Sequence, residues 1–128
     1  MKKIGIAILV TLTSLSSHAL ETACFTYLQK GQKMVGRIKM NETKVSINWN
    51  LNGTPSKDYT ESGTINSGTF QKDRTSGAIS GVAYFSESQD SYDANVAISQ
   101  TGVFFQPKWQ NGGPIDPNMK PMPRTSCP

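Results

Sequence analysis

The chain reads KVSINWNL from Lys44 to Leu51, and apolar side chains occupy every second position of this stretch. Such alternation is the pattern of a β-strand with one face buried and the other in water. The preceding run, residues 33–40, alternates in the same way, and only residues 41–43 separate the two. A separation of this length is typical of a hairpin. We therefore expect two antiparallel neighbouring strands, with Trp49 on the buried face.

Strand-forming residues also dominate the rest of the chain. Residues 20–128 hold ten Thr, six Ile and five Val, against three Leu and five Ala. Branched side chains favour pleated sheets, whereas Ala and Leu favour helices. The sequence therefore predicts a small all-β domain, an antiparallel barrel or a two-sheet sandwich of about 6–7 strands. The further strand regions are residues 59–70, with Ile65 and Phe70 as core contacts, then 78–85, apolar on both faces, and a last hairpin of 92–98 and 102–106.

The first 19 residues have the composition of a secretory signal peptide. Lys2 and Lys3 give a positive start, residues 4–15 form an apolar run, and Ala19 offers the small side chain that signal peptidase needs. The run is too short for a membrane-spanning helix. We expect cleavage after Ala19, which leaves residues 20–128 as one domain exported to the periplasm or secreted, and the Met-Lys-Lys start is typical of bacterial export.

Removal of residues 1–19 changes which functions the composition permits. Loss of Lys2 and Lys3 lowers the net charge from +4 to +2, which is a weak electrostatic footprint for a nucleic-acid-binding protein. Loss of His18 removes the only histidine, and with it histidine-based catalysis and histidine-ligated metals. Motifs for phosphate or dinucleotide binding are absent from residues 20–128. We expect no catalytic residue, no cofactor and no bound metal.

Two cysteines, Cys24 and Cys127, remain near the two ends of the mature chain. In an exported protein this count predicts one disulfide that ties the ends together. The alternative is a lipoprotein acylated at Cys24, but Glu21 stands where such a signal needs an aliphatic residue. Six of the seven prolines lie in residues 107–128. Because proline cannot donate to a sheet, we expect an irregular strap over this range.

Several side chains are candidates for contact with a partner. Trp109 lies in a polar stretch at the start of the strap, where it either packs the strap onto the sheet or binds a partner or sugar. A stiff, extended strap loses little entropy on binding, and methionines give it adaptable apolar contact. The candidate partner- or ligand-binding residues are Trp109, Tyr84, Tyr92, Met119, Met122 and Arg124.

An acidic turn offers a second kind of site. Glu87, Asp90 and Asp93 are closely spaced, and such oxygen-rich groups can hold a cation. The spacing lacks the glycine and the alternating acids of a calcium loop, so the favoured interpretation is a solvated turn. Glu87 could also form a glycosidase pair with Asp58 or Glu61, which would require a defined separation across a cleft.

These exclusions leave three functional hypotheses. The first is an exported, non-enzymatic binding protein that docks on another protein as an inhibitor, an immunity factor or an envelope accessory. The second is a small module that binds carbohydrate or another envelope ligand through Trp109 and either Tyr84 or Tyr92. The third is a minor hydrolase that uses carboxylates. No stretch carries a signature specific to a known family.

Overall fold

The computed structural model describes residues 21–49, 51, 59–86, 91–108 and 112–128. Regular structure in these ranges consists of nine strands and one short 3-10 helix, and no residue in them forms an α-helix. The elements are β1 (Glu21–Gln29), β2 (Gln32–Met40), β3 (Lys44–Trp49), β4 (Tyr59–Ile65), η2 (Ser67–Thr69), β5 (Gln71–Lys72), β6 (Ile79–Phe85), β7 (Tyr92–Ile98), β8 (Gly102–Pro107) and β9 (Met122–Thr125).

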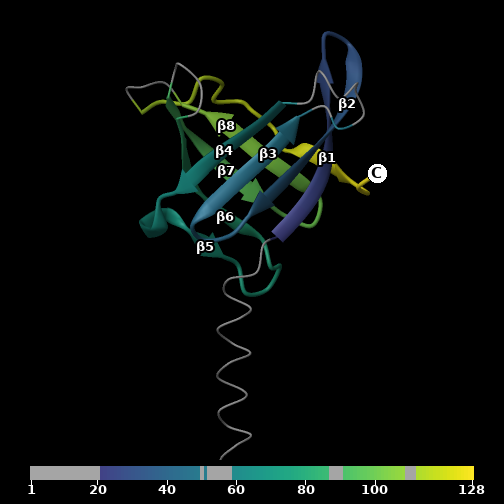
Figure 1. The fold of residues 1–128 in the computed structure, drawn as a ribbon. Helices are drawn as coiled ribbons and strands as arrows, with labels where there is room; N and C mark the ends of the chain where they lie inside the picture. Colours follow the sequence, from purple (N-terminus) through teal and green to yellow (C-terminus); the bar gives the residue numbers. More distant parts are fainter. Residues whose placement is uncertain (1–20, 50, 52–58, 87–90, 109–111) are drawn as a thin grey trace, which may run out of the picture.

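Eight of the strands close into an antiparallel barrel (Figure 1). The ring runs β4, β3, β2, β1, β9, β8, β7 and β6, and it closes where Gly63–Ile65 of β4 pair with Ala83–Phe85 of β6. The ninth strand, β5, pairs with β6 outside the ring. The expected all-β fold is confirmed, and of the two architectures it is the barrel that forms.

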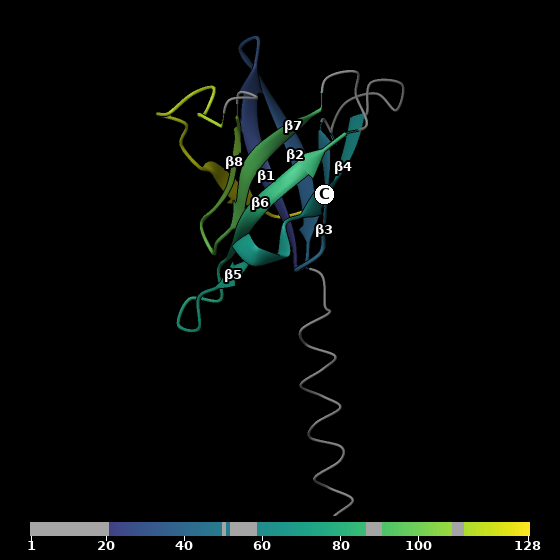
Figure 2. The same cartoon turned by 90° about the vertical axis from the view of Figure 1, so that its left-hand side faces the viewer.

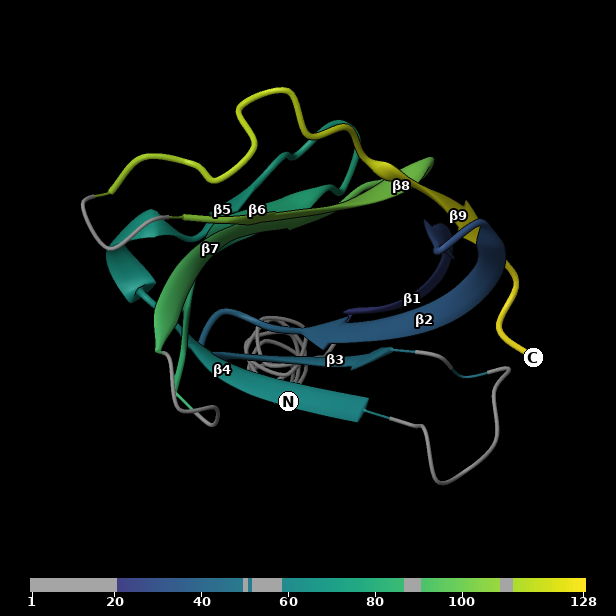
Figure 3. The ribbon, with the colours of Figure 1, turned by 90° about the horizontal axis from the view of Figure 1, so that it is seen from above.

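The barrel is flattened. Seen from above, β1 to β4 form one wall and β6 to β8 form the facing wall (Figure 3). Figure 2 shows β6 and β7 crossing in front of the first wall, with β8 to their left. Each wall has one face toward the core and one toward solvent, which is the arrangement that alternating strands require.

The core fills the space between the two walls. Ile38 and Met40 of β2 and Ile47 of β3 are almost fully buried, as the period-two pattern predicts. Trp49 packs against this core from the end of β3, which confirms its expected position. Close contact explains a glycine in β2, because a Cβ added at Gly36 would lie 2.5 Å from the Phe25 ring. The buried core residues are Ala23, Phe25, Ile38, Met40, Val45, Ile47, Ile65, Ile79, Ala83, Phe85, Ala94, Val96, Ile98 and Val103.

Three expectations about the strands need correction. The strand expected over residues 59–70 ends at Ile65, because the Asn66 side chain accepts a hydrogen bond from the N–H of Gly68 and starts η2. The strands β1, β5 and β9 were not predicted, so the count is nine and not about 6–7. The strap at 107–128 is not irregular throughout, because Met122–Thr125 form β9 and complete the barrel.

The disulfide joins the two ends of the domain as predicted. Cys24 in β1 bonds to Cys127, 103 residues later, with a Cα–Cα distance of 5.1 Å. Cys24 is also in register with Thr125 of β9. The covalent bond and one of the two shortest pairings of the ring therefore lie side by side, and both hold β9 against β1.

Candidate functional site

The two candidate tyrosines lie on opposite faces of the barrel wall. Tyr84 points outward from β6 and is 49 % exposed. Tyr92 in β7 points inward: its ring stacks on Phe85 with centroids 5.2 Å apart, and its hydroxyl donates to Glu61 Oε1 at 2.8 Å. The structure therefore does not bring these two rings together as one stacking surface.

Glu61 accepts hydrogen bonds on both carboxylate oxygens. Besides the Tyr92 bond, Trp49 Nε1 donates to Glu61 Oε2 at 3.2 Å. Trp49 also makes edge-on contacts with Tyr27 and Phe105, at centroid distances of 5.2 and 5.4 Å. Rings from both walls thus meet around this carboxylate inside the barrel. We call this group the aromatic cluster; it comprises Phe25, Tyr27, Trp49, Phe85, Tyr92 and Phe105.

The strap residues have structural partners. Met122 is half-buried, packs against the core and is in register with Val103. The guanidinium of Arg124 donates from Nη1 to the carbonyl oxygen of Ser99 at 2.7 Å, and its backbone N–H donates to Thr101 at 3.0 Å. Met119 is half-buried in the segment before β9. Met122 and Arg124 thus contribute to barrel closure.

The remaining predicted residues fall partly outside the described ranges. Trp109, Glu87, Asp90 and Asp58 lie there, so the sugar-stacking, cation and glycosidase hypotheses stay predictions. Asp93 is described and exposed on β7, in register with Tyr84. Within the described ranges, no group of three or more His, Cys, Asp or Glu side chains could hold a metal ion.

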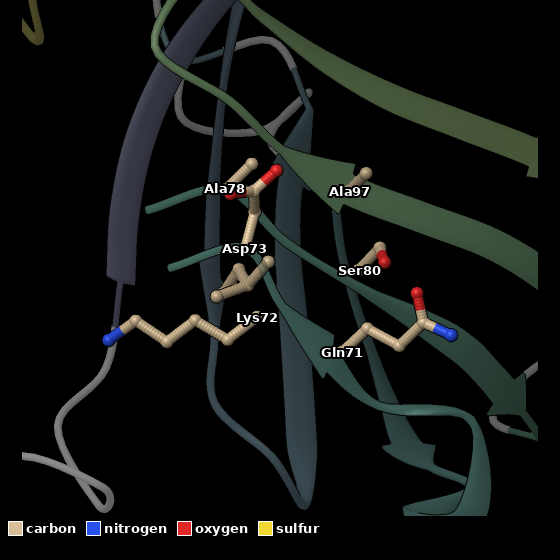
Figure 4. A pocket seen from close by; sticks show the side chains of 7 residues that line it. Gln71, Lys72, Asp73, Ala78, Ser80 and Ala97 are labelled. Atoms are coloured by element: carbon tan, nitrogen blue, oxygen red, sulfur yellow. The ribbon is translucent and has the colours of Figure 1, made fainter. Parts of the chain in front are cut away.

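A shallow hollow of about 340 Å³ lies on the outer surface between β5, β6 and β7. Gln71, Lys72 and Asp73 line one side of it, opposite Ser80 and Ala97 (Figure 4). The Asp73 carboxylate is engaged within its own turn, where Oδ1 accepts from the backbone N–H groups of the residues two and three positions later. These hydrogen bonds lower the pKa of Asp73 below its usual value of 3.8.

The feature that the sequence did not predict is the hairpin of β1 and β2. The two strands pair over their full nine residues, from Glu21 with Met40 to Gln29 with Gln32. Their other neighbours pair only near the base, because the register with β9 ends at Phe25 and that with β3 begins at Arg37. We call residues 26–35 the distal hairpin. Beyond these registers its strands pair with each other, the backbone N–H of Leu51 donates to the carbonyl oxygen of Val35 at 2.6 Å, and the hairpin projects at the upper end of the barrel (Figure 1).

The turn of the distal hairpin fixes its geometry. Lys30 and Gly31 form the two-residue loop, with φ values of 51° and 81°. Positive φ at both positions gives the turn whose twist matches that of paired strands. Lys30 is the only non-glycine residue with positive φ in the described part of the chain. At the base, Tyr27 packs against Phe25 and Trp49, which connects the hairpin to the aromatic cluster.

The outer face of the hairpin combines an exposed apolar side chain with cations. Leu28 is 74 % exposed and lies directly across from Lys33. The next pairs along the same face are Thr26 with Val35 and Cys24 with Arg37. No ion pair joins Lys30, Lys33 or Arg37 to a carboxylate of the described residues. The site offers a rigid protruding surface and no nucleophile or acid–base pair.

The signal for this hairpin was present in the sequence. Gly31 interrupts two runs, and apolar side chains alternate on both sides of it, at Phe25 and Tyr27 and again from Met34 onward. The sequence does not specify where the registers with β3 and β9 stop. No protein-family model, no curated protein and no solved structure matches this chain. Among the described residues, no helix is long and apolar enough to cross a membrane.

Proposed function

We propose that the protein is an exported, non-enzymatic binding protein that docks on another protein through the outer face of the distal hairpin. It would act as an inhibitor, an immunity factor or an envelope accessory. The composition of residues 1–19 supports export, and the disulfide is consistent with an oxidising compartment. The barrel by itself does not indicate a function, because one fold serves many functions.

The observation that carries the proposal is the exposure of Leu28 on a preorganised hairpin. Full burial of a leucine side chain contributes about 1.5–3 kcal/mol, and the folded protein leaves most of this free energy unused at Leu28. The turn at Lys30 and the packing of Tyr27 already fix the hairpin. A partner therefore meets an ordered surface, and binding loses less conformational entropy than it would with a flexible loop.

Site-specific photocrosslinking tests the proposal. A photoreactive residue in place of Gln29, next to Leu28, is expected to give one discrete protein adduct in the source organism. The same residue in place of Tyr84, on the facing wall, is expected to give none. Excess unmodified protein should suppress the Gln29 adduct, whereas excess Leu28→Ser protein should not.

The competition has a matched control, because Ile115 is also an exposed apolar side chain, at 47 %. Ile115→Ser protein should compete as well as the unmodified protein. Equal competition by the Leu28→Ser and Ile115→Ser variants, or an adduct formed equally from Tyr84, would overturn docking through the hairpin.

A further inference from the structure

We infer that the docking partner presents an acidic surface, in which carboxylates border an apolar depression that receives Leu28. This inference rests on the proposed function and adds the chemistry of the partner. The observation behind it is the charge of the hairpin. Residues 22–41 contain Lys30, Lys33, Arg37 and Lys39 and no Asp or Glu.

The positions of the cations match a rim around an apolar centre. Lys33 is the direct cross-strand neighbour of Leu28, at a Cβ separation of about 5 Å for such pairs. Arg37 lies on the same face, four residues further along β2, at a distance of about 13 Å. Between them, Val35 pairs with Thr26 and continues the less polar centre. Interfaces are built in this way, with an apolar centre and a charged rim.

Two carboxylates lie at the far end of the same wall. Glu21 is the first residue of β1 and pairs with Met40, and Glu42 follows in the turn after β2. Both are therefore at the base of the hairpin, close to Lys39 and away from Lys33. Among the described residues, neither Lys30 nor Lys33 forms an ion pair with a carboxylate, so their charge is available to a partner.

The turn gives a second, independent observation. Two-residue turns with positive φ at both positions favour Asn, Asp or Gly at the first position. This chain has Lys30 there, at φ 51°. Conformations that side chains rarely adopt are found most often at functional sites. A cation held at the tip against the local preference indicates that the charge itself is used.

An acidic protein fits this surface better than an anionic membrane does. Segments that lie on membranes insert several apolar side chains together. In the described part of the chain, Leu28 is the only large apolar side chain on the hairpin that is mostly exposed, and the other two exposed ones, Tyr84 and Ile115, belong to other segments. A narrow protrusion with one mostly exposed apolar side chain and two cations, and with Arg37 at its base, matches a protein depression with acidic edges.

The test uses the photoreactive residue at Gln29 in the full-length protein. Lys30→Gln, Lys33→Gln and Arg37→Gln are introduced together, and the control variant removes the same charge elsewhere. At low partner concentration, we expect this triple substitution to lower the adduct yield about tenfold. Each exposed ion pair contributes a factor of about two to three to the affinity for a partner. The control should stay within about twofold, and the effect should shrink at high salt. The control substitutions are Lys72→Gln, Arg74→Gln and Lys120→Gln.

The outcomes separate the two proposals. Crosslinked partner peptides rich in Asp and Glu, together with the tenfold loss, support the acidic partner. A protein adduct that the hairpin substitutions leave unchanged overturns the acidic partner but keeps docking. An adduct whose added mass is that of a phospholipid overturns a protein partner. If the photoreactive protein that retains Lys30, Lys33 and Arg37 gives no adduct, the proposed function is overturned as well. Matching circular dichroism spectra and melting temperatures show that each variant is folded.

Discussion

Arg124 Nη1 donates a hydrogen bond of 2.7 Å to the carbonyl oxygen of Ser99, which joins the last strand of the barrel to the turn between β7 and β8. Strand pairing alone holds β9 weakly, because it is in register with only two residues of β1 and two of β8. Side-chain contacts therefore complete the closure. The Arg124 guanidinium also reaches Thr22 of β1 at 3.5 Å, so that it contacts both neighbours of its own strand.

Arg124→Gln is expected to lower the free energy of unfolding by about 1 kcal/mol, because a charge-assisted hydrogen bond is lost from an exposed site. Urea denaturation followed by tryptophan fluorescence measures this change. Lys120→Gln removes the same charge from an exposed residue of the strap and should leave stability within about 0.5 kcal/mol. Equal stability of the two variants would show that the Ser99 contact does not support closure.

The disulfide is expected to contribute strongly to stability. A crosslink that closes a loop of this length removes up to about 4.7 kcal/mol of entropy from the unfolded chain. Cys24→Ala with Cys127→Ala should therefore lower the free energy of unfolding by about 2–5 kcal/mol. Urea denaturation in the presence and absence of reductant provides the comparison. An unfolding midpoint that neither the substitutions nor the reductant change would contradict this expectation.

The turn after β5 should respond to acid. The backbone N–H groups of Ser76 and Thr75 lower the pKa of Asp73 in the folded protein. The stabilisation from a lowered pKa is fully present above the unfolded value and is lost as the pH falls through the folded value. We therefore expect the Thr75 and Ser76 amide resonances to titrate with a midpoint below 3.8. Asp73→Asn should abolish this titration, and a midpoint at or above 3.8 would contradict the hydrogen bonds as its cause.

A residue that tolerates positive φ at the first position of the turn between β1 and β2 should raise stability and weaken partner binding. Lys30→Asn places a residue that tolerates positive φ at the first turn position, so we expect a gain of up to about 1 kcal/mol in unfolding free energy. The same substitution removes a cation and should reduce the yield of the Gln29 photoadduct. Denaturation and crosslinking on the same preparation measure both. A variant that is more stable and crosslinks fully would show that the charge of Lys30 is not used in docking.

Strands with a dry and a wet face could be predicted from the sequence, as could the apolar run that forms β6, whereas β1, β5 and β9 could not. The alternation up to Trp49 located β3, and two cysteines in a chain that was expected to be exported predicted the disulfide. In β1, Cys24 is buried on the outer side while Phe25 is buried on the inner side, so its period-two signal is weak. In β9, Pro123 resembles a break, but so short a strand tolerates a proline.

Only part of the candidate site could be predicted. Contact of Met122 and Arg124 with a partner stays a prediction, and within the barrel the two residues contact β8 and the β7–β8 turn. Sequence patterns show which side chains share a face of one strand, but not which neighbouring strand covers that face. Leu28 lies three residues beyond Phe25, where the register of β1 with β9 ends. That ending is a property of the closed barrel.

Amide hydrogen exchange of the free protein and of its purified complex tests docking through the distal hairpin most directly. Beyond Phe25, the outer edge of β1 has no strand partner among the described residues, so amides there should exchange fast in the free protein. The account predicts that the complex slows exchange across residues 26–35 and leaves the outer face of β6, around Tyr84, unchanged. Protection confined to the face around Tyr84, with residues 26–35 exchanging as in the free protein, would contradict it.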